Sequence, residues 1–443
     1  MTNLSRRSLI AGGMALSALP LRPALAMTGD PDVVVIGAGA AGLTAAQTLI
    51  GQGKTVVVVE AADRIGGRAY TESETFGVPF DHGCSWISAA NANPYKKLAR
   101  DWGFDILDHS NAGEAVYVGD RRANGKERKA YDRAWSGIMT ALYKAGKAGQ
   151  DVPASTVIPQ NDDFSGVCQS WIGAMDYGVD FADLSTMDDW NSAESNPSYM
   201  IKEGHGALVA RQAQGLPVKL NTPATAVNWG GKGVSVETPA GTIRAKACIV
   251  TVSTGVLAAG SIKFTPELPA WKSDAVANLP MGLLAKITLQ FDGDKLGFGY
   301  NNWLTYWVPN EMPAKACYFL TWPFNFDIMI GFVGGKFGWE LSAAGEEAAV
   351  DFALGEVVRI AGSSVRKHFV KGHLTGWADN PLTRGAYAAA RPGHYGARAE
   401  LERPLANRLF FAGEAVAGAH VALCGGAYLS GEKVAREVAR QLS

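Results

Sequence analysis

Residues 32–49 read DVVVIGAGAAGLTAAQTL, and this stretch decides the fold of the chain. The β-branched run Val33–Ile36 is typical of a strand buried in a parallel sheet. It leads directly into three glycines, and an Ala- and Leu-rich pattern then predicts a helix. Gly37 permits the tight turn, Gly39 lets a pyrophosphate approach the backbone, and Gly42 brings strand and helix together. We therefore expect a nucleotide phosphate to bind at the N-terminus of this helix.

A second strand, and the acid that ends it, agree with this prediction. The strand pattern covers residues 55–59 and ends in Glu60, which lies 23 positions after Gly37. A carboxylate at this point accepts hydrogen bonds from both hydroxyls of a ribose. The same charge repels a 2′-phosphate, so the sequence predicts a dinucleotide other than NADP.

Length and composition limit the classes of function. The chain has 443 residues, which is long for a single core and suits two domains. Its net charge is −1 without a basic run, which argues against nucleic acid or an anionic membrane as partner. The five cysteines show no C-x-x-C spacing, and the histidines form no H-x-x-x-H or Ser/His/Asp pattern. We therefore expect no metal site, and free thiols with one or two disulfide bridges as the alternative.

The N-terminus has the features of an export signal. Arg6 and Arg7 precede a weakly apolar run to about Leu21, and residues 24–26 offer an A-x-A cleavage site. The paired arginines resemble a twin-arginine signal at residues 1–26, which implies the twin-arginine export machinery as partner and a periplasmic location. An apolar run of about 13 residues cannot span ~30 Å of hydrocarbon, so we do not expect an integral membrane protein.

Strand patterns recur far apart in the chain, while residues 111–196 read as helices and loops. Further strands are expected at 218–220, 234–236, 248–252, 286–291 and 409–411, and a last helix from about 426 to 441. Nucleotide-type segments at both ends and in the middle imply a cofactor domain with a second domain inserted into it. We assign residues 27–110, 205–265 and 381–443 to the cofactor domain, and residues 111–204 and 266–380 to the substrate domain.

The residues after Glu60 distinguish between dinucleotides. Residues 60–68 read EAADRIGGR, with two adjacent glycines between two arginines. Arg64 and Arg68 can neutralise pyrophosphate oxygens, and the glycines let the chain pass close to a cofactor. The run resembles the E-x-x-x-R-x-G-G-R fingerprint of glutathione reductase-like FAD proteins in their amine oxidase branch. The resemblance implies an α/β fold, in which an FAD-binding Rossmann domain of the glutathione reductase type is interleaved with a substrate domain of mixed β-sheet and helices.

Four further segments extend the resemblance to the flavin amine oxidase family, the monoamine, polyamine and L-amino-acid oxidase group. They are DHGCSWI at 81–87, LNTPATAV at 220–227, WADNP with GAY at 377–381 and 385–387, and FAGE with GAYLSG at 411–414 and 426–431. Asn380 stands where the family usually has an aspartate. By this resemblance the FAD-binding residues are Gly37, Gly39, Ala40, Ala41, Gly42, Glu60, Ala61, Arg64, Gly66, Gly67, Arg68, Ser85, Trp86, Val227, Gly413, Glu414 and Ala427.

The resemblance also assigns roles to particular residues at the cofactor. Glu414 is expected to hold ribityl or phosphate hydroxyls, and the backbone of Val227 to contact the adenine side. The helix that begins near Gly426 is expected to point its positive end at the N1/O2 edge of the flavin. Ala386 stands where the monoamine oxidases carry the cysteine that links the flavin, so we expect non-covalent FAD.

Lys286 is a lone charge in the apolar strand pattern of residues 279–289. A buried ammonium group is costly unless it is paired or hydrogen-bonded. The simpler interpretation of the pattern is a lysine on an edge strand that reaches water. The resemblance instead implies a lysine linked through water to flavin N5, where it assists reduction or reoxidation of the flavin.

The substrate pocket is expected at Trp86, Tyr387, Leu423 and Cys424, with Trp377 in the segment that faces the flavin ring. Family members often flank the amine with two aromatic rings. Tyr387 aligns with one wall, but the other wall falls on Leu423, so half of the expected cage is missing. Cys424 is interpreted as a small packing residue. The segment after Trp86 also lacks the acidic residue of some polyamine oxidases, which disfavours a polyamine as substrate.

The expected reaction is the oxidation of a small amine, with Lys286, Tyr387 and Trp377 as the catalytic residues. A hydride equivalent passes from the carbon beside nitrogen to flavin N5, and the imine hydrolyses to an aldehyde or ketone. The electrons go on to O2 or to a periplasmic acceptor, and a homodimer is compatible with the family. Two alternatives stay open: an L-amino-acid oxidase with Arg384 or Arg391 on the substrate carboxylate, and a flavin-binding module without turnover.

Overall fold

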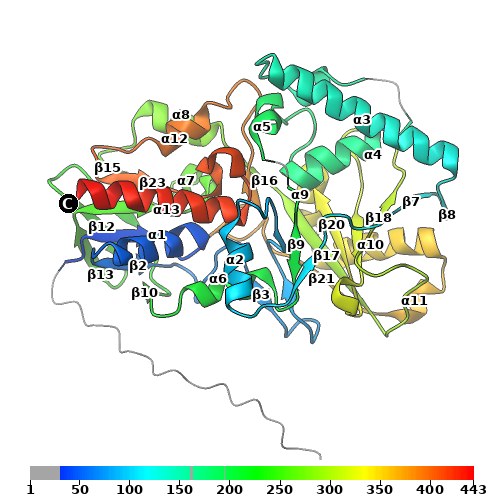
Figure 1. The fold of residues 1–443 in the computed structure, drawn as a ribbon, viewed down its shortest axis with the longest axis horizontal. Coiled ribbons are helices and arrows are strands. Elements are labelled where there is room, and N and C mark those ends of the chain that lie inside the picture. Colours follow the sequence, from blue (N-terminus) through cyan, green and yellow to red (C-terminus); the bar gives the residue numbers. More distant parts are fainter. Residues whose placement is uncertain (1–29, 160–162, 194) are drawn as a thin grey trace, which may run out of the picture.

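The computed structural model describes residues 30–159, 163–193 and 195–443, so the predicted export signal at 1–26 lies outside the described residues. Two lobes lie side by side along the long axis of the molecule (Figure 1). The Rossmann lobe contains a parallel sheet, helix α1 (Ala40–Gly51) and helix α13 (Cys424–Gln441). The other lobe is built on a seven-stranded sheet and is called the seven-stranded lobe below.

The Rossmann lobe has a five-stranded sheet in which every pairing is parallel. Its order is β10 (Val218–Lys219), β2 (Val56–Val59), β1 (Val33–Ile36), β14 (Ala247–Val250) and β23 (Leu409–Phe411). Val33 and Val35 of the central strand pack in one core, and Val34 and Ile36 pack in another on the opposite face. Because both faces are buried, the strand is β-branched throughout rather than alternating with polar residues.

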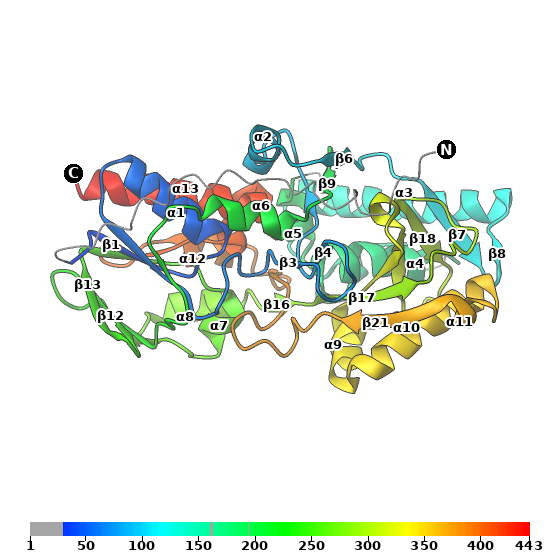
Figure 2. The ribbon, with the colours of Figure 1, turned by 90° about the horizontal axis from the view of Figure 1, so that it is seen from below.

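Helices and a second sheet cover the two faces of the parallel sheet. Helices α1 and α13 pack against each other on one side of β1. Strands β12 and β13 lie on the other side of β1 (Figure 2). The second sheet has the order β13 (Gly241–Ala245), β12 (Val234–Thr238), β11 (Ala226–Asn228) and β15 (Lys263–Thr265). Three helices complete this lobe: α7 (Thr254–Ala258), α8 (Ala270–Ala277) and α12 (Ala397–Glu402).

Short strands occupy the middle of the molecule, where β3, β9 and β16 lie between the lobes in both views. A three-stranded sheet joins β5 (Trp86–Ile87), β9 (Tyr199–Ile201) and β6 (Ile106–Asp108). Two-stranded pairs are formed by β3 (Thr71–Glu72) with β4 (Phe80–Asp81), and by β16 (Met281–Gly282) with β22 (Tyr387–Ala388). Helices α2 (Pro94–Asp101) and α6 (His205–Gln212) flank this region.

The seven-stranded sheet has the order β21 (Phe369–Leu374), β17 (Leu284–Phe291), β20 (Ile328–Gly334), β19 (Tyr318–Thr321), β18 (Asn302–Tyr306), β7 (Glu114–Val118) and β8 (Arg121–Arg122). Strands β7 and β8 lie in the region for which the sequence predicts only helices and loops, so that prediction is wrong there. β7 is short, and its parallel partner is the distant strand β18. Such non-local pairing leaves little periodic signal in the sequence around the strand.

Helices cover both faces of this sheet, with α3 on one face and α10 on the other in both views. The first group is α3 (Gly125–Lys147), α4 (Ser165–Gln169), the π-helix η2 (Ser170–Tyr177) and α5 (Thr186–Asn191). The second group is α9 (Gly335–Ala344), α10 (Glu346–Ala361) and α11 (Val365–His368). Asn124 caps α3 and forms a reciprocal capping box with Glu127, which fixes where this long helix begins.

The strands of the two large sheets come from different stretches of the chain. Those of the parallel sheet fall within 27–110, 205–265 and 381–443, and those of the seven-stranded sheet within 111–204 and 266–380. The exact boundaries stay a prediction. Within the described ranges, no helix is both long and apolar enough to cross a membrane.

Candidate active site

One cavity of about 1490 Å³ connects the two lobes. It begins at the carboxyl ends of β1, β2 and β14 and extends to strands β17 and β20 and to helices η2 and α5. In parallel α/β sheets ligands bind outside the carboxyl ends of the strands, as this cavity does. Most of the residues predicted from the sequence line it.

The glycine turn after β1 forms one end of the cavity. Gly37 has a φ of +104°, and its N–H donates to the Val59 carbonyl at 2.8 Å. A Cβ at Gly42 would lie 1.9 Å from the Gly37 carbonyl oxygen, so only glycine fits there. Gly37, Gly39, Ala40 and Ala41 line the cavity, whereas Gly42 does not, because its role is the close packing of α1 on the turn.

Glu60 is held rigidly where β2 ends. Its Oε2 accepts from the Ala38 N–H at 2.7 Å, and its Oε1 accepts from the Ala62 N–H at 2.8 Å. Glu60 and Ala61 line the cavity, as predicted from the acid at the end of the second strand. The carboxylate is thus oriented by the backbone of the glycine turn that it faces.

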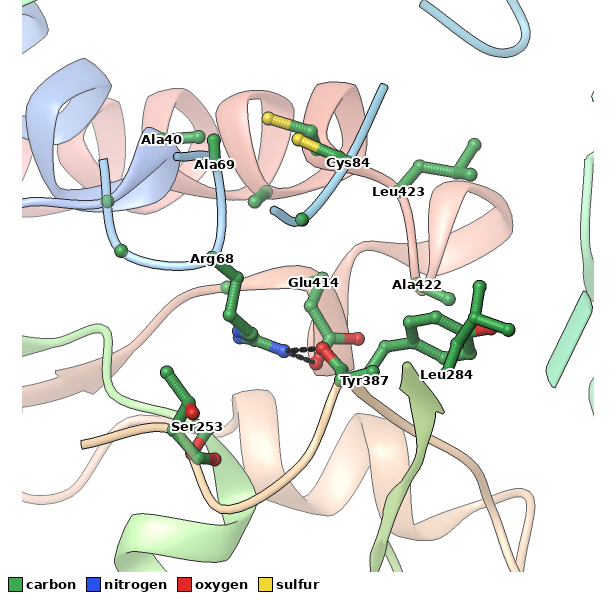
Figure 3. Close-up of a pocket in the computed structure, with 18 of the residues that line it drawn as sticks. Ala40, Arg68, Ala69, Cys84, Ser253, Leu284, Tyr387, Glu414, Ala422 and Leu423 are labelled. Atoms are coloured by element: carbon green, nitrogen blue, oxygen red, sulfur yellow. Dashed lines mark hydrogen bonds and ion pairs between the residues drawn. The ribbon is translucent and has the colours of Figure 1, made fainter. Parts of the chain in front are cut away.

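The two arginines of the fingerprint line the cavity with Gly66 and Gly67, but each has partners within the protein. Arg68 Nη1 donates to Glu414 Oε1 at 2.8 Å and to the Ala386 carbonyl at 2.9 Å, and Figure 3 shows the ion pair. Arg64 Nη1 donates to the Gly67 carbonyl at 2.9 Å, and burial lowers the pKa of Arg64. Both guanidinium groups are therefore fixed in orientation before a ligand arrives.

Glu414 provides a test of whether the cavity fits FAD. Its Oε1 accepts from Arg68 and, at 3.1 Å, from the Ala388 N–H. Its Oε2 is buried without a hydrogen-bond partner among the described residues, although Glu414 and Gly413 line the cavity. A buried oxygen left unpaired is costly, and a hydroxyl of the cofactor would satisfy it. The donor set therefore fits the predicted dinucleotide.

Helix α13 points its positive end toward the cavity. It begins at Cys424, two residues earlier than predicted, and its N-cap residue Leu423 makes no side-chain cap hydrogen bond. The first N–H groups of this 18-residue helix therefore lack an intrahelical partner. Leu423, Cys424 and Ala427 all line the cavity. The arrangement favours a negative charge near the start of the helix.

Lys286 lies on β17 between β20 and β21, so the interpretation as an edge-strand lysine that reaches water is wrong. Its side chain lines the cavity although the residue is only 3% exposed. Nζ donates to the Asp81 carbonyl, the Gly83 carbonyl and Ser85 Oγ, each at 2.6 Å. Burial lowers the pKa of Lys286 to about 8. The link through water to flavin N5 stays a prediction.

Aromatic side chains form much of the wall. Trp377 Nε1 donates to the His82 carbonyl at 2.7 Å, and the Tyr387 hydroxyl donates to the Met175 carbonyl at 2.8 Å. Trp86 stacks on Trp303 with ring centroids 5.7 Å apart. The sequence motifs indicate only part of this wall, because Trp303 lies on β18, for which the sequence predicts no strand. Further lining rings are Trp171, Trp303 and Phe332.

Val227 was assigned to the adenine side, and the structure corrects this. It lies in the middle of β11, where its backbone pairs with β12 on one side and β15 on the other, and the residue is fully buried. Val227 does not line the cavity, whereas Ala224 does. The strand begins only at Ala226, so the loop before it approaches the cavity.

The structure also contradicts the prediction that Arg384 or Arg391 binds a substrate carboxylate. Neither Arg384 nor Arg391 lines the cavity, and both are exposed on the surface. Within the described residues, the arginines that line the cavity are Arg64 and Arg68, both in the cofactor segment. The described residues of the lining therefore offer no arginine for an amino-acid carboxylate at the substrate end.

Two acidic residues at the substrate end of the cavity are not predicted from the sequence. Asp176 on η2 and Asp189 on α5 line the cavity, and the Tyr177 hydroxyl donates to Asp189 Oδ1 at 3.2 Å. Desolvation, and after it the charge of Asp189, raises the pKa of Asp176 to about 7. No sequence signal could have found them, because their segment reads as irregular and the π-helix has no simple periodicity.

Comparison with known proteins gives a consistent family. A family model described as flavin containing amine oxidoreductase matches residues 40–164 and 170–439. Polyamine oxidase 4 of Oryza sativa subsp. japonica is 28% identical over 492 residues, which cover 98% of this chain and 93% of that protein. Lysine-specific histone demethylase 1 homolog 3 of Arabidopsis thaliana is also 28% identical, over 92% of this chain but 30% of that protein.

A similar fold occurs in a solved structure of putrescine oxidase bound to putrescine. The two chains superpose with a TM-score of 0.77 at 20% identity, covering 92% of this chain and 98% of the other. At this identity the likeness shows the fold alone. It confirms the predicted α/β architecture with an FAD-binding domain.

The fold and the cavity define a flavin-dependent oxidoreductase. Since the family model covers most of its length, the chain belongs to the flavin containing amine oxidoreductase family. The protein is an enzyme that uses FAD to oxidise a C–N bond of an amine to an imine, as predicted. Neither the L-amino-acid oxidase nor the module without turnover receives support from the matches or from the cavity.

Proposed function

We propose that this enzyme oxidises an amine that carries a second cationic group, and that Asp176 and Asp189 bind that second group. The observation that carries the proposal is the pair of carboxylates at the substrate end of the cavity. The arginines and the lysine of the described lining are Arg64, Arg68 and Lys286, and each donates hydrogen bonds to other protein groups. The acid pair therefore lacks an arginine or lysine partner from the described lining.

Asp176 is suited to receive a cation from a ligand. Its carboxylate is exposed to the cavity, although the residue lies deep within the protein. No hydrogen bond or cation from the described residues lowers its pKa. An ammonium group placed beside it would restore an opposite charge, and a hydrogen bond between charged groups stabilises binding by about 1.5–3 kcal/mol.

The acid pair would also replace the acidic residue that the segment after Trp86 lacks. Relatives of this chain are named polyamine oxidases, and a structure of similar fold is a putrescine oxidase. The segment after Trp86 lacks the acidic residue of some polyamine oxidases. In this chain η2 and α5 would supply the negative charge instead, so a diamine or polyamine is the favoured substrate class.

The remaining site residues would bind and orient the reacting amine. FAD, when bound, accepts the hydride equivalent from the carbon beside nitrogen. The rings of Tyr387, Trp86 and Trp377 exclude water from this end, and desolvation favours the neutral amine. Lys286 holds the 81–85 segment against the cavity through its three hydrogen bonds. Leu423 would supply an apolar contact where a second aromatic ring is missing.

A substrate series tests the second cation. Anaerobic flavin bleaching would compare 1,4-diaminobutane with n-pentylamine, which has a methyl group in place of the second ammonium. We expect kcat/KM to favour the diamine by roughly 10- to 100-fold, as one charged hydrogen bond allows. Asp176→Asn and Asp189→Asn should lower this preference.

Asp180→Asn is the matched control, because Asp180 is a neighbouring acid with a raised pKa that does not line the cavity. It should keep the preference for the diamine. Equal rates for the two amines in the wild type would refute the second-cation site, while amine oxidation itself would still be visible as bleaching by n-pentylamine.

We also propose that FAD is held without a covalent bond. Ala386 lines the cavity with a methyl group that cannot link a flavin, and its carbonyl accepts from Arg68. Acid precipitation should release all flavin into the supernatant. Yellow colour retained in the pellet would contradict this, and mapping the flavinylated peptide would then show whether Cys84 or Cys424 is attached.

Export of the folded, FAD-loaded enzyme to the periplasm by the twin-arginine route is a further proposal, supported by Arg6, Arg7 and the A-x-A site at 24–26. Replacing both arginines by lysine should leave an uncleaved protein in the cytoplasm. Rapid reoxidation of the reduced enzyme by O2 or by cytochrome c would identify the acceptor, and light scattering would show whether it is a homodimer.

A further inference from the structure

We propose that Cys84, His205 and Cys424 form a Cys₂His site for a thiophilic divalent cation, for which Zn²⁺ is the probe. Two Sγ atoms and one imidazole nitrogen all lie within 4.8 Å of one another. Figure 3 shows Cys84 beside helix α13, at the wall of the cavity. The site goes beyond amine oxidation, which assigns these three residues no chemistry.

His205 is the observation that points to a ligand. The residue is completely buried, and neither ring nitrogen makes a hydrogen bond within the described part of the chain. Leaving a buried polar atom unpaired costs about 1–3 kcal/mol. A cation would occupy one nitrogen, whereas a disulfide between Cys84 and Cys424 would remove both S–H groups and leave that nitrogen without a donor. The structure therefore favours a metal over a disulfide.

His205 and Cys84 are both held in place by the segment that begins at Asp81. The backbone N–H of His205 donates to Asp81 Oδ2 at 3.1 Å, and that of Gly206 donates to Asp81 Oδ1 at 3.2 Å. Cys84 follows in the same segment, which is anchored by the ammonium group of Lys286. Ligands fixed in this way by surrounding hydrogen bonds need little rearrangement to bind a cation.

Cys424 is fixed by close packing at the start of α13. A Cβ at Gly425 would lie 2.4 Å from the Asn93 side chain, and one at Gly426 would lie 1.8 Å from the His420 carbonyl oxygen. The Sγ atom of Cys424 lies within 4.8 Å of the Cys84 Sγ and of an imidazole nitrogen of His205. The thiolate is the form of cysteine that binds metals.

The charges balance for a divalent cation. Two thiolates and one neutral imidazole leave a neutral complex, and relative to two thiols and a neutral histidine two protons pass to solvent. No electrons are transferred. Cys84 and Cys424 line the cavity, from which a fourth ligand would complete the coordination, as in open Cys₂His sites. The ligands come from three distant parts of the chain, which is why no C-x-x-C pattern revealed them.

The test uses the full-length, FAD-loaded enzyme, reduced and stripped with a chelator. After addition of Zn²⁺ and desalting, plasma mass spectrometry should find close to one zinc per FAD. Zn²⁺ should also protect Cys84 and Cys424 from alkylation in the wild type, as shown by peptide mapping. Zinc below one-tenth of an equivalent, or unchanged alkylation of these two cysteines, would overturn the proposal.

Variants separate this site from adventitious zinc. Cys84→Ser, Cys424→Ser and His205→Asn should each weaken zinc binding by at least roughly tenfold. Cys248→Ala removes a buried thiol that is not near the cluster and should retain one zinc. If a ligand variant fails to fold, the protection from alkylation in the wild type still decides. Full zinc binding by the ligand variants would place the metal elsewhere.

Discussion

Lys286 and Asp176 line the same cavity, yet their ionisable groups stand in opposite situations. Lys286 has three acceptors within 2.6 Å, and burial lowers its pKa to about 8. Among the described residues none donates a hydrogen bond that lowers the pKa of Asp176, and desolvation raises that pKa to about 7. One charge is satisfied by the protein itself, while the other would be satisfied by a ligand.

The difference distinguishes the cofactor end of the site, which Lys286 holds rigid, from the substrate end, where Asp176 would bind a ligand. The acceptors of Lys286 belong to the segment that joins β4 to β5, so the lysine fixes that segment beside the predicted flavin position. Asp176 stands on a π-helix, a conformation that is rare and often found at functional sites. We expect changes at Lys286 to alter chemistry and stability, and changes at Asp176 to alter the choice of substrate.

The largest effect is expected for Lys286→Met. The change leaves three buried acceptors without a donor and removes a group placed beside the predicted flavin position. We expect flavin reduction or reoxidation to slow by at least ~10²-fold, in the range that positioned proton-transfer groups contribute. Stopped-flow measurement of both half-reactions would show this, with FAD still bound.

Lys272→Met is a closely matched control. Lys272 is also buried, and its Nζ donates to the carbonyls of Glu400 and Leu401, each at 2.8 Å, and of Arg403 at 2.5 Å. It does not line the cavity. This variant should lose stability but keep both half-reaction rates. Equal slowing in the two variants would mean that Lys286 acts only through the fold.

The contrast also explains what could be predicted from the sequence. Glu60, the glycine turn and the fingerprint arginines are contiguous, and each depends on local backbone geometry that a motif records. Lys286 stood out because a lone charge in an apolar strand is unusual. Asp176, Asp189 and the Cys84–His205–Cys424 cluster exist only through tertiary contacts, so no spacing along the chain revealed them.

The misplaced residues show the limit of counting along a motif. Val227 was assigned from a strand end, but β11 begins at Ala226, and the preceding loop approaches the cavity at Ala224. Arg384 and Arg391 flank Tyr387 in sequence, yet the backbone turns their side chains toward solvent. Sequence position indicated the right segment for Val227, while the tertiary structure decided which residues line the cavity.

A smaller effect is expected in the pH dependence of substrate choice. Below about pH 7 Asp176 becomes protonated, so kcat/KM for 1,4-diaminobutane relative to n-pentylamine should fall by up to ~10-fold per pH unit. Taking the ratio removes effects shared by both amines, including ionisation of Lys286. Asp176→Asn should give a flat ratio near pH 7. A wild-type ratio that does not change between pH 6 and 8 would contradict the role of Asp176.

Asp176→Asn should also change stability, in a direction fixed by the sign of the shift. The pKa of Asp176 is raised on folding from 3.8 to about 7, so the native state binds the proton more tightly. Stability from this group is therefore lost as pH rises from about 4 to 7. Calorimetry should show a higher Tm for Asp176→Asn at pH 8 and little difference at pH 4. A lower Tm at pH 8 would indicate a cation already bound there.

The smallest effect is expected for Arg384→Ala. Arg384 is exposed, does not line the cavity, and has a φ of +54°, which favours neither arginine nor alanine. Since no substrate group can reach it, kcat/KM for 1,4-diaminobutane should change less than twofold, within the range of ordinary surface substitutions. The same assay, applied to lysine and to its decarboxylated analogue 1,5-diaminopentane, would show whether a substrate carboxylate raises or lowers kcat/KM. We expect the diamine to reduce the flavin faster, because the acid pair repels a carboxylate. If lysine reduced the flavin faster than the diamine, and Arg384→Ala abolished this advantage, the L-amino-acid oxidase hypothesis would be supported instead.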